Sequence, residues 1–327
     1  LRNAFKVKDI RSRIIFTFLM LVLIRIGSQL PVPGVNGDVF RSWFESQAAG
    51  LGFFDAITGG SFLSMSVFAL NITPYITSSI IMQLLTIAIP ALEELQKDGE
   101  DGRKKIAEIT RYLTVGLALF ESSAMTFGFW RSGYLLQKNA LTVITVVTAL
   151  TAGSAVLMWI GERITERGVG NGISIVLVIN IISRIPADMG GLWDQFIANK
   201  GILQGVIAAV VILAIIIGMV VFVIILQGAQ RKIPVQYSKK MQGRKQVGGQ
   251  QTHIPLKVNT SGVIPVIFAQ SLMQTPVILA SLFGWGNGTG IGSKILKGLN
   301  QSNWCNPKEP IYTIGLLVYI ALIIGFA

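Results

Sequence analysis

Apolar and polar residues alternate in long blocks along the chain, and eight of the apolar blocks predict membrane-spanning helices. Crossing the ~30 Å hydrocarbon core of a bilayer takes about 20 mostly apolar residues, and fewer where neighbouring helices shelter the span. The blocks lie at residues 14–30, 74–91, 109–130, 140–160, 172–185, 201–226, 261–285 and 310–327. Because the last block reaches the final residue without a flanking charge, we expect the chain to be a piece of a longer protein.

The composition supports this interpretation. Hydrophobic residues make up 51% of the 327 residues and charged residues only 13%, whereas soluble domains carry about 25% charged residues. The chain is therefore predicted to be an all-α polytopic membrane protein. With one Cys and one His, it cannot build a disulfide framework of its own, and we expect no metal site and no other cofactor.

The distribution of Lys and Arg predicts the topology, because cytoplasmic segments are enriched in these residues. The formal net charge is +12, and most of the 28 Lys and Arg residues lie before residue 14, at 97–111, at 163–167 and at 231–257. When these segments are placed on the cytoplasmic side, the amino terminus lies there as well. We therefore expect a multi-pass protein with a cytoplasmic amino terminus.

Residues 51–69 are too apolar for an exposed loop, yet Gly52, Asp55, Gly59 and Gly60 interrupt them. Two interpretations stay open. One is a packed surface loop with an amphipathic turn. The other is a short re-entrant half-helix, which a bilayer permits only where protein or water satisfies its backbone.

Residues 71–83 combine an aliphatic stripe with many polar groups. Ile72, Ile76 and Ile80 recur every four residues and share one helix face, with Thr and Ser side chains beside them. The pattern is typical of a helix that faces water along part of its length. Ordinary hydrogen bonding between membrane helices explains it equally well.

Residues 159–174 contain three closely spaced glycines, Gly168, Gly170 and Gly172. No strand precedes them and no Gly-Lys-Ser/Thr follows, so a phosphate-binding loop is not indicated. A turn that lets the next helix begin abruptly fits better. That helix carries Ile173 and Leu177 four residues apart, on one face.

Residues 227–258 form a long basic segment without acidic residues. Such a segment either orients the chain in the membrane or docks a large anionic partner such as ribosomal RNA. The following span, 261–285, again has polar stripes, with Gln270 and Gln274 on one and Ser271 and Thr275 on another.

Several of these stretches together resemble the SecY-type family (SecY/Sec61-alpha), a subunit of the protein-conducting translocase. They are residues 74–83 (PYITSSIIMQ), 159–174 (WIGERITERGVGNGIS), 242–244 (QGR), 252–259 (THIPLKVN) and 262–265 (GVIP). Asn71 departs from the family, which often has Gly there. The resemblance covers the whole chain but only the first eight of the family's ten transmembrane helices.

The resemblance implies a translocon fold of two pseudo-symmetric, inverted halves. The amino-terminal half would be residues 1–186, with five helices and a plug segment near 52–66; residues 187–327 would be an incomplete second half, with three helices and the basic cytoplasmic loop 227–258. The implied function is that of the central pore-forming subunit of a protein-conducting channel. Such a channel passes unfolded polypeptides across the membrane and releases membrane-protein helices sideways through a lateral gate.

The resemblance also implies roles for individual residues, none of them catalytic. Aliphatic side chains close the family's hourglass pore at its waist, and the matching positions are Ile72, Ile76, Ile173, Leu177 and Ile267. The plug that closes the outer funnel matches Phe53, Phe54, Asp55, Ala56, Ile57, Thr58, Gly59, Gly60, Ser61, Phe62, Leu63 and Ser64. Candidate polar positions of the lateral gate are Gln83, Ser271 and Thr275, and Arg244 and Lys245 match the tip of the docking loop.

The resemblance also implies partners, and because the chain has no nucleotide-binding motif, one of them must supply the driving force. The driving force would come from the SecA ATPase or from a ribosome, whose RNA would meet the basic loop. Further implied partners are the SecE and SecG subunits, signal peptides, nascent chains, the lipid bilayer and a YidC-type insertase. The expected location is the bacterial cytoplasmic membrane.

Two other classes remain as alternatives. A secondary transporter also uses broken helices but normally needs an intramembrane charge; the candidates are Arg25, near the outer end of the first span, and Glu121 in the third. An intramembrane enzyme is poorly supported, because the single His253 lies in a loop and no intramembrane acid pair is present.

Overall fold

The computed structural model describes residues 7–46, 55, 57–198, 201–235, 240–242, 245–247, 252–259, 262, 264–282, 291–300, 304 and 310–327. The chain divides into two compact units. Unit 1 contains residues 1–185 and 266–326, and unit 2 contains residues 186–265 and residue 327. This grouping is by compactness, and the organisation into two inverted halves stays a prediction.

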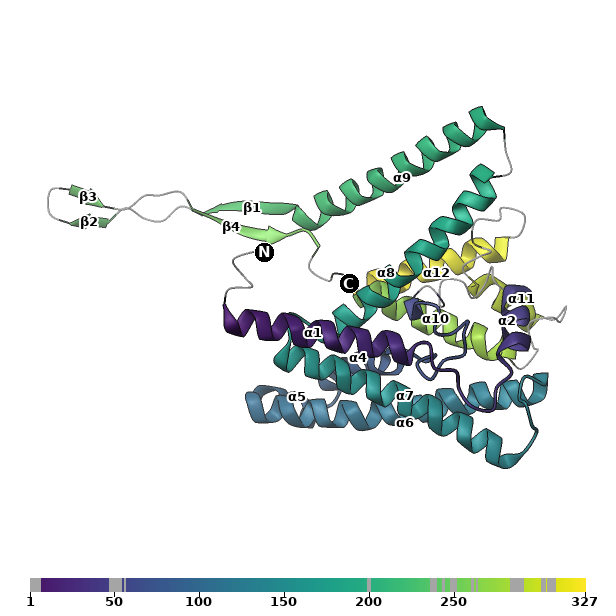
Figure 1. The fold of residues 1–327 in the computed structure, drawn as a ribbon. Helices are drawn as coiled ribbons and strands as arrows, with labels where there is room; N and C mark the ends of the chain where they lie inside the picture. The colour runs from purple at the N-terminus through teal and green to yellow at the C-terminus, as the bar shows by residue number, and fades with distance from the viewer. Residues whose placement is uncertain are drawn as a thin grey trace. The chain divides into compact units, whose positions relative to one another are not determined.

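Each of the eight predicted spans contains a helix (Figure 1). These helices are α1 (Lys8–Gly27), α4 (Thr73–Ala88), α6 (Glu100–Ser132), α7 (Ala140–Arg167), α8 (Gly172–Trp193), α9 (Ile202–Gly228), α10 (Ile264–Leu282) and α12 (Pro310–Phe326). Shorter helices are α2 (Gly37–Ser46), α5 (Pro90–Lys97) and α11 (Ile291–Leu299), and a π-helix, η2 (Asp194–Ala198), follows α8.

Length and apolar composition alone qualify fewer of the described helices as spans. Three pass this test, at Ala140–Arg167, Gly172–Ala198 and Leu203–Gly228, and the bent pair α4–α5 would add a fourth if it were one span. Several of the others carry charges inside or near their apolar stretch, such as Arg25 in the last turn of α1 and Glu121 within α6. Such helices need protein neighbours around their polar groups, which is typical of a multi-helix membrane protein.

The predicted span 74–91 is wrong at its end. α4 stops at Ala88, and α5 leaves it at an angle of 102°. The cause is Pro90, because the residue before a proline avoids the helical region, and Ile89 is extended, with φ −112° and ψ 112°. α6 also begins earlier than predicted, at Glu100, and α8 continues past Pro186 to Trp193.

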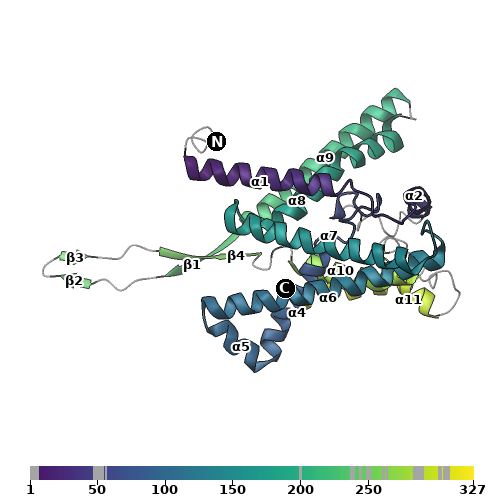
Figure 2. The same cartoon turned by 60° about the horizontal axis from the view of Figure 1, so that its bottom comes forward.

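Unit 1 is built around the pair α6 and α7, which run side by side in both views (Figure 2). α4 packs on α6, and α1 packs on α7. Two polar contacts join the central pair. The Arg111 Nε lies 2.8 Å from Glu162 Oε1, and the hydroxyls of Ser122 and Thr151 are 2.9 Å apart.

Two buried apolar clusters fill unit 1. The first is rich in aromatic rings that meet edge to face, with Phe40 of α2 5.5 Å from Phe62 and 5.4 Å from Phe129 of α6. The second joins α1, α7 and α8 to the start of α4. Its buried members are Ile24, Phe68, Ile72, Leu157, Ile160, Ile164 and Val176.

Unit 2 contains α9 and a β-ribbon. α9 is apolar around its whole circumference and almost entirely uncovered within the structure, which suits a helix surrounded by lipid. The segment expected as a basic loop is a ribbon instead, of β1 (Gln230–Val235) paired antiparallel with β4 (Thr252–Lys257). Between these two strands in the sequence lies a smaller hairpin, of β2 (Lys240–Gln242) paired antiparallel with β3 (Lys245–Val247) (Figure 1).

Candidate functional site

Four of the five predicted pore-ring residues gather in one place. Ile72 is fully buried in the second apolar cluster, and Ile76, Ile173 and Leu177 are half-buried and pack against that cluster. The chain brings them together from α4 and α8, about a hundred residues apart. The fifth, Ile267, lies in α10, but its side chain is outside the described part of the structure.

Glycines at the crossing of α7 and α8 permit this approach. A Cβ on Gly161 would lie 3.3 Å from Ile173 Cγ1 and 3.5 Å from Ile72 Cδ1. A Cβ on Gly172 would lie only 1.9 Å from the Gly161 carbonyl oxygen, so the backbones of α7 and α8 touch at this point. The two glycines thereby let α8 approach α7 closely enough for Ile72 and Ile173 to lie against the same point of α7.

The turn between α7 and α8 is held by its own hydrogen bonds. Asn171 caps α8, because its Oδ1 accepts from the amides of Ile173 at 3.1 Å and Ser174 at 3.3 Å. The Gly172 amide donates to Thr165 Oγ1 at 2.8 Å, and the Val169 amide donates to Thr17 Oγ1 of α1 at 3.2 Å. These amide groups are already paired within the protein, so the turn is not a phosphate cradle. α8 begins at Gly172, as predicted.

The described part of the predicted plug is buried in unit 1. Residues 55, 57 and 58 are helical, and turns follow as far as Ser64. Asp55, Thr58 and Phe62 are at most 1% exposed, so this part is not a surface loop. Phe53, Phe54 and Ala56 lie outside the described residues.

Internal hydrogen bonds keep the plug segment compact. The Leu63 amide donates to Asp55 Oδ1 at 2.9 Å, and the Gly60 amide donates to the Asp55 carbonyl at 3.0 Å. At Met65 the chain is tied to the segment that follows α1, because the Val32 amide donates to the Met65 carbonyl at 2.9 Å.

The predicted plug segment also contacts α8. Arg184 of α8 donates from Nη1 to Asp55 Oδ2, in an ion pair whose carboxylate side chain is 0% exposed and whose guanidinium side chain is 24% exposed. Gly59 has φ +68°, and a Cβ there would meet the Asn180 carbonyl oxygen at 2.7 Å. Glycine therefore meets both requirements of this position, the left-handed backbone and the close approach to α8.

Asn71, the departure from the family pattern, joins the plug to two helices. Its Nδ2 donates to the Ile57 carbonyl at 3.1 Å, and its Oδ1 accepts from Asn180 Nδ2 of α8 at 3.0 Å. Its carbonyl accepts from Ser154 Oγ of α7 at 3.2 Å. Asn71 adopts φ +53°, which Asn tolerates better than most residues. It directly precedes Ile72, so hydrogen bonds anchor the backbone between the predicted plug segment and the predicted ring.

Of the predicted gate residues, the structure describes the side chain of Gln83. Gln83 is exposed on α4. Ser271 and Thr275 lie one turn apart on α10, but their side chains are outside the described part. Their role stays a prediction.

The predicted docking residues lie at the far end of the ribbon. Lys245 opens β3, where it pairs with Gln242, and Arg244 is outside the described residues. Nearer α9, the exposed basic side chains are Arg231 and Lys232 on β1 and Lys257 on β4. Apolar side chains accompany them, including Ile254 and Leu256, both about half exposed.

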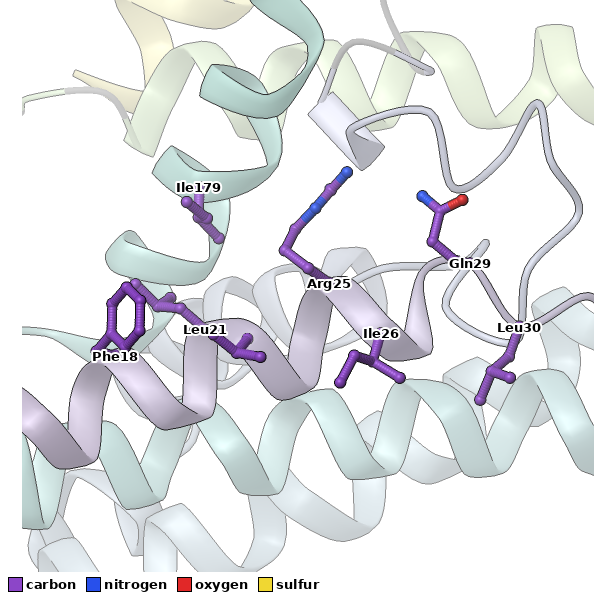
Figure 3. Close-up of a pocket in the computed structure, with 8 residues that line it drawn as sticks. Phe18, Leu21, Arg25, Ile26, Gln29, Leu30 and Ile179 are labelled. Carbon is purple, nitrogen blue, oxygen red and sulfur yellow. The ribbon is translucent and has the colours of Figure 1, made fainter.

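The two ionisable residues that would favour a transporter have no ion-pair partner among the described residues. Arg25 lines an open cavity of about 590 Å³ that Ile179 of α8 also lines, and Figure 3 shows its side chain rising from α1. Its Nη1 is buried without a hydrogen-bond partner, and the other lining residues are apolar apart from Gln29. A site for solute and coupling ion needs converging polar groups, and this cavity does not offer them.

Sequence reasoning missed Asn180 and Arg184. A carboxylate such as Asp55 in a buried apolar segment needs a partner. This requirement could have indicated that a basic side chain from another helix lies beside it. The partner itself could not be found from the sequence, because 129 residues separate Asp55 from Arg184.

Comparisons with known proteins agree with these features. Residues 66–327 match the SecY family. The chain is 42% identical to the protein translocase subunit SecY of Halalkalibacterium halodurans over 333 residues, covering 99% of this chain and 74% of that protein. It is also 42% identical to the SecY subunit of Bacillus subtilis over 330 residues, covering 99% and 73%.

Solved structures show the same fold. A structure described as a protein conducting channel superposes with a TM-score of 0.64 and 18% identity, over 97% of this chain and 71% of the other. Sec61 from a canine ribosome–channel complex gives the same TM-score, identity and coverage. At this identity the likeness concerns the fold alone.

Proposed function

The chain belongs to the SecY family, and from this premise we propose that it forms the central pore of a protein-conducting channel in the bacterial cytoplasmic membrane. Unfolded secretory polypeptides pass through this pore, and membrane-protein helices leave it sideways. The chain carries out no catalysis of its own. The pore lies between two inverted halves, residues 1–186 and 187–327.

One observation carries the proposal, which is the convergence of Ile72, Ile76, Ile173 and Leu177 beside a buried, anchored plug segment. A narrow ring of aliphatic side chains expels water and so blocks ions. The same side chains deform easily around a polypeptide of any sequence, because they form no directed bonds. Ile267 completes the ring, and the plug closes the outer funnel.

The lateral gate lies between α4, α6 and α10, with Gln83, Ser271 and Thr275 as its polar positions. Hydrogen bonds between membrane helices contribute only about 0.6–2 kcal/mol each. A gate held by a few such bonds opens when an apolar signal peptide binds beside it.

The driving force comes from a partner that docks on the cytoplasmic β-ribbon. Arg244 and Lys245 contact the SecA ATPase or ribosomal RNA, and the exposed Arg231, Lys232 and Lys257 extend the basic surface. Contacts of Lys and Arg with RNA phosphates release counterions and therefore weaken as salt rises. SecE, SecG and a YidC-type insertase are the expected membrane partners.

Site-directed crosslinking tests the pore. In a Cys305→Ser background, a thiol introduced by Ile76→Cys is expected to crosslink a translocation intermediate whose cysteine lies at the membrane midplane. The matched control is Val220→Cys, on the uncovered surface of α9. Crosslinking from residue 220 but not from residue 76 would contradict the proposed pore.

A further inference from the structure

We propose that Asp55, Asn71, Asn180 and Arg184 form a polar latch that positions the plug against α8 and thereby sets how often the closed channel opens. The inference rests on the proposed function, because it names the residues that regulate the plug of that pore. They act through the position of the plug and do not touch the translocating chain.

The ion pair is the first arm of the latch. Asp55 is completely buried, and a buried carboxylate is tolerated only when it is paired and hydrogen-bonded. Arg184 supplies the charge, while the Leu63 amide supplies a hydrogen bond from within the plug. Withdrawing the plug from α8 separates these two charges, so the pair resists opening.

The amide chain is the second arm. Asn180 donates to Asn71, and Asn71 donates to the Ile57 carbonyl, so an unbroken path of hydrogen bonds runs from α8 to the plug backbone. Both Asn side chains are at most 3% exposed, hence neither bond competes with bulk water in the closed state.

Both arms lie close to the point where the plug backbone approaches the backbone of α8. Gly59 rests on the Asn180 carbonyl, and Arg184 lies one helical turn further along α8. α8 also carries Ile173 and Leu177 at its other end. A polypeptide that pushes Ile173 and Leu177 away from the ring residues of α4 therefore displaces the same helix that contacts the plug.

Two features weaken the latch and allow the plug to leave α8. Asn180 Oδ1 is buried without a hydrogen-bond partner, which lowers the stability of the closed arrangement. The guanidinium is partly exposed, so water reaches one side of the ion pair. The polar contacts with α8 thus add to the apolar packing of Phe62 against Phe40, and they are the part of the closed arrangement that a single substitution can release.

Ion leak through the complete translocase in proteoliposomes tests the latch. Asp55→Asn keeps an oxygen that can accept from the Leu63 amide, but it removes the charge and the second acceptor oxygen, which faces Arg184. Arg184→Gln removes the cation. Each is expected to raise the resting leak about tenfold, which corresponds to about 1.4 kcal/mol. The double variant is expected to leak no more than either single variant, because the two charges act as one unit. Arg184→Lys keeps a cation at this position and is expected to leak much less than Arg184→Gln.

Asn180→Ala tests the second arm and should raise the leak independently of the ion pair, so its effect should add to that of Arg184→Gln. The matched control is Arg131→Gln, an exposed arginine in the last turn of α6, which should leave the leak unchanged. Recovery of each variant as an intact complex by size-exclusion chromatography separates leak from misfolding.

The outcomes separate the latch from the function on which it rests. If deletion of residues 57–64 raises the leak while the Asp55 and Arg184 variants do not, the plug stands and the latch is refuted. If the two single effects add fully in the double variant, the ion pair is not a unit and the first arm is refuted. If the wild-type translocase neither moves a preprotein nor responds to the deletion, the proposed function itself fails.

Discussion

At the residue scale, glycines decide how closely α7 and α8 approach. Gly172 leaves no room for a methyl group, because its Cβ position is 1.9 Å from a backbone oxygen that cannot move independently of α7. Gly190, on the same helix, has nothing within 4 Å of its Cβ position. Glycine is therefore required by packing at position 172 but not at position 190 of the same helix.

We predict that Gly172→Ala destabilises the protein, whereas Gly190→Ala does not. Forcing a methyl group into a packed contact costs about 1–3 kcal/mol or more, while Ala in an open helical position is favoured over Gly by about 1 kcal/mol. Thermal unfolding of the purified complex should show a lower Tm for Gly172→Ala only. An equal Tm for the two variants would contradict the close backbone contact between α7 and α8.

At the element scale, polar contacts position the helices of unit 1 while apolar clusters fill the space between them. The Ser122–Thr151 pair is fully interior to the α6–α7 contact, and Arg111–Glu162 closes the same pair of helices at a more exposed end. Thr148, by contrast, is exposed and bonds carbonyls of its own helix. Only the first two contacts cross between helices.

We predict a small but measurable coupling between Ser122 and Thr151. Hydrogen bonds between membrane helices average about 0.6 kcal/mol, so a double-mutant cycle with Ser122→Ala and Thr151→Val should give a coupling free energy of that order. Pairing Ser122→Ala with Thr148→Val is the control and should give no coupling. A coupling of zero in the first cycle would mean that the two hydroxyls do not stabilise the α6–α7 contact.

At the scale of the whole molecule, charge determines which side of the membrane each connection occupies. The basic ribbon between α9 and α10 contains no acidic residue, whereas the connection after α6 holds the exposed apolar Leu136 and a single Lys. The excess of Lys and Arg orients such chains during insertion. The two connections are therefore expected on opposite sides of the membrane.

Cysteine labelling tests this topology. In a Cys305→Ser background, Lys232→Cys should react with a membrane-impermeant maleimide only from the cytoplasmic side, and Leu136→Cys only from the outside. Labelling both in inside-out vesicles and in intact cells provides the reciprocal control. Reaction of both positions from the same side would overturn the predicted orientation.

The predictions from sequence succeeded where the signal was local and failed where it depended on distant neighbours. All eight apolar blocks contain helices, because a long apolar run in a membrane must satisfy its own backbone. The end of α4 was missed, although Pro90 supplied the signal. The ribbon was missed because β1 and β4 find their partners in each other, more than fifteen residues apart.

By itself, the sequence determined the class of protein, the positions of the helices and, through motifs such as residues 159–174, the family. These depend on composition and on short-range order, which a single chain displays directly. Only the tertiary structure decided that Ile72 and Ile173 both lie against Gly161, that Asp55 pairs with Arg184, and that Asn71 binds Asn180. The physical reason is that a buried charge or amide requires a partner but does not specify which one, and packing alone makes that choice.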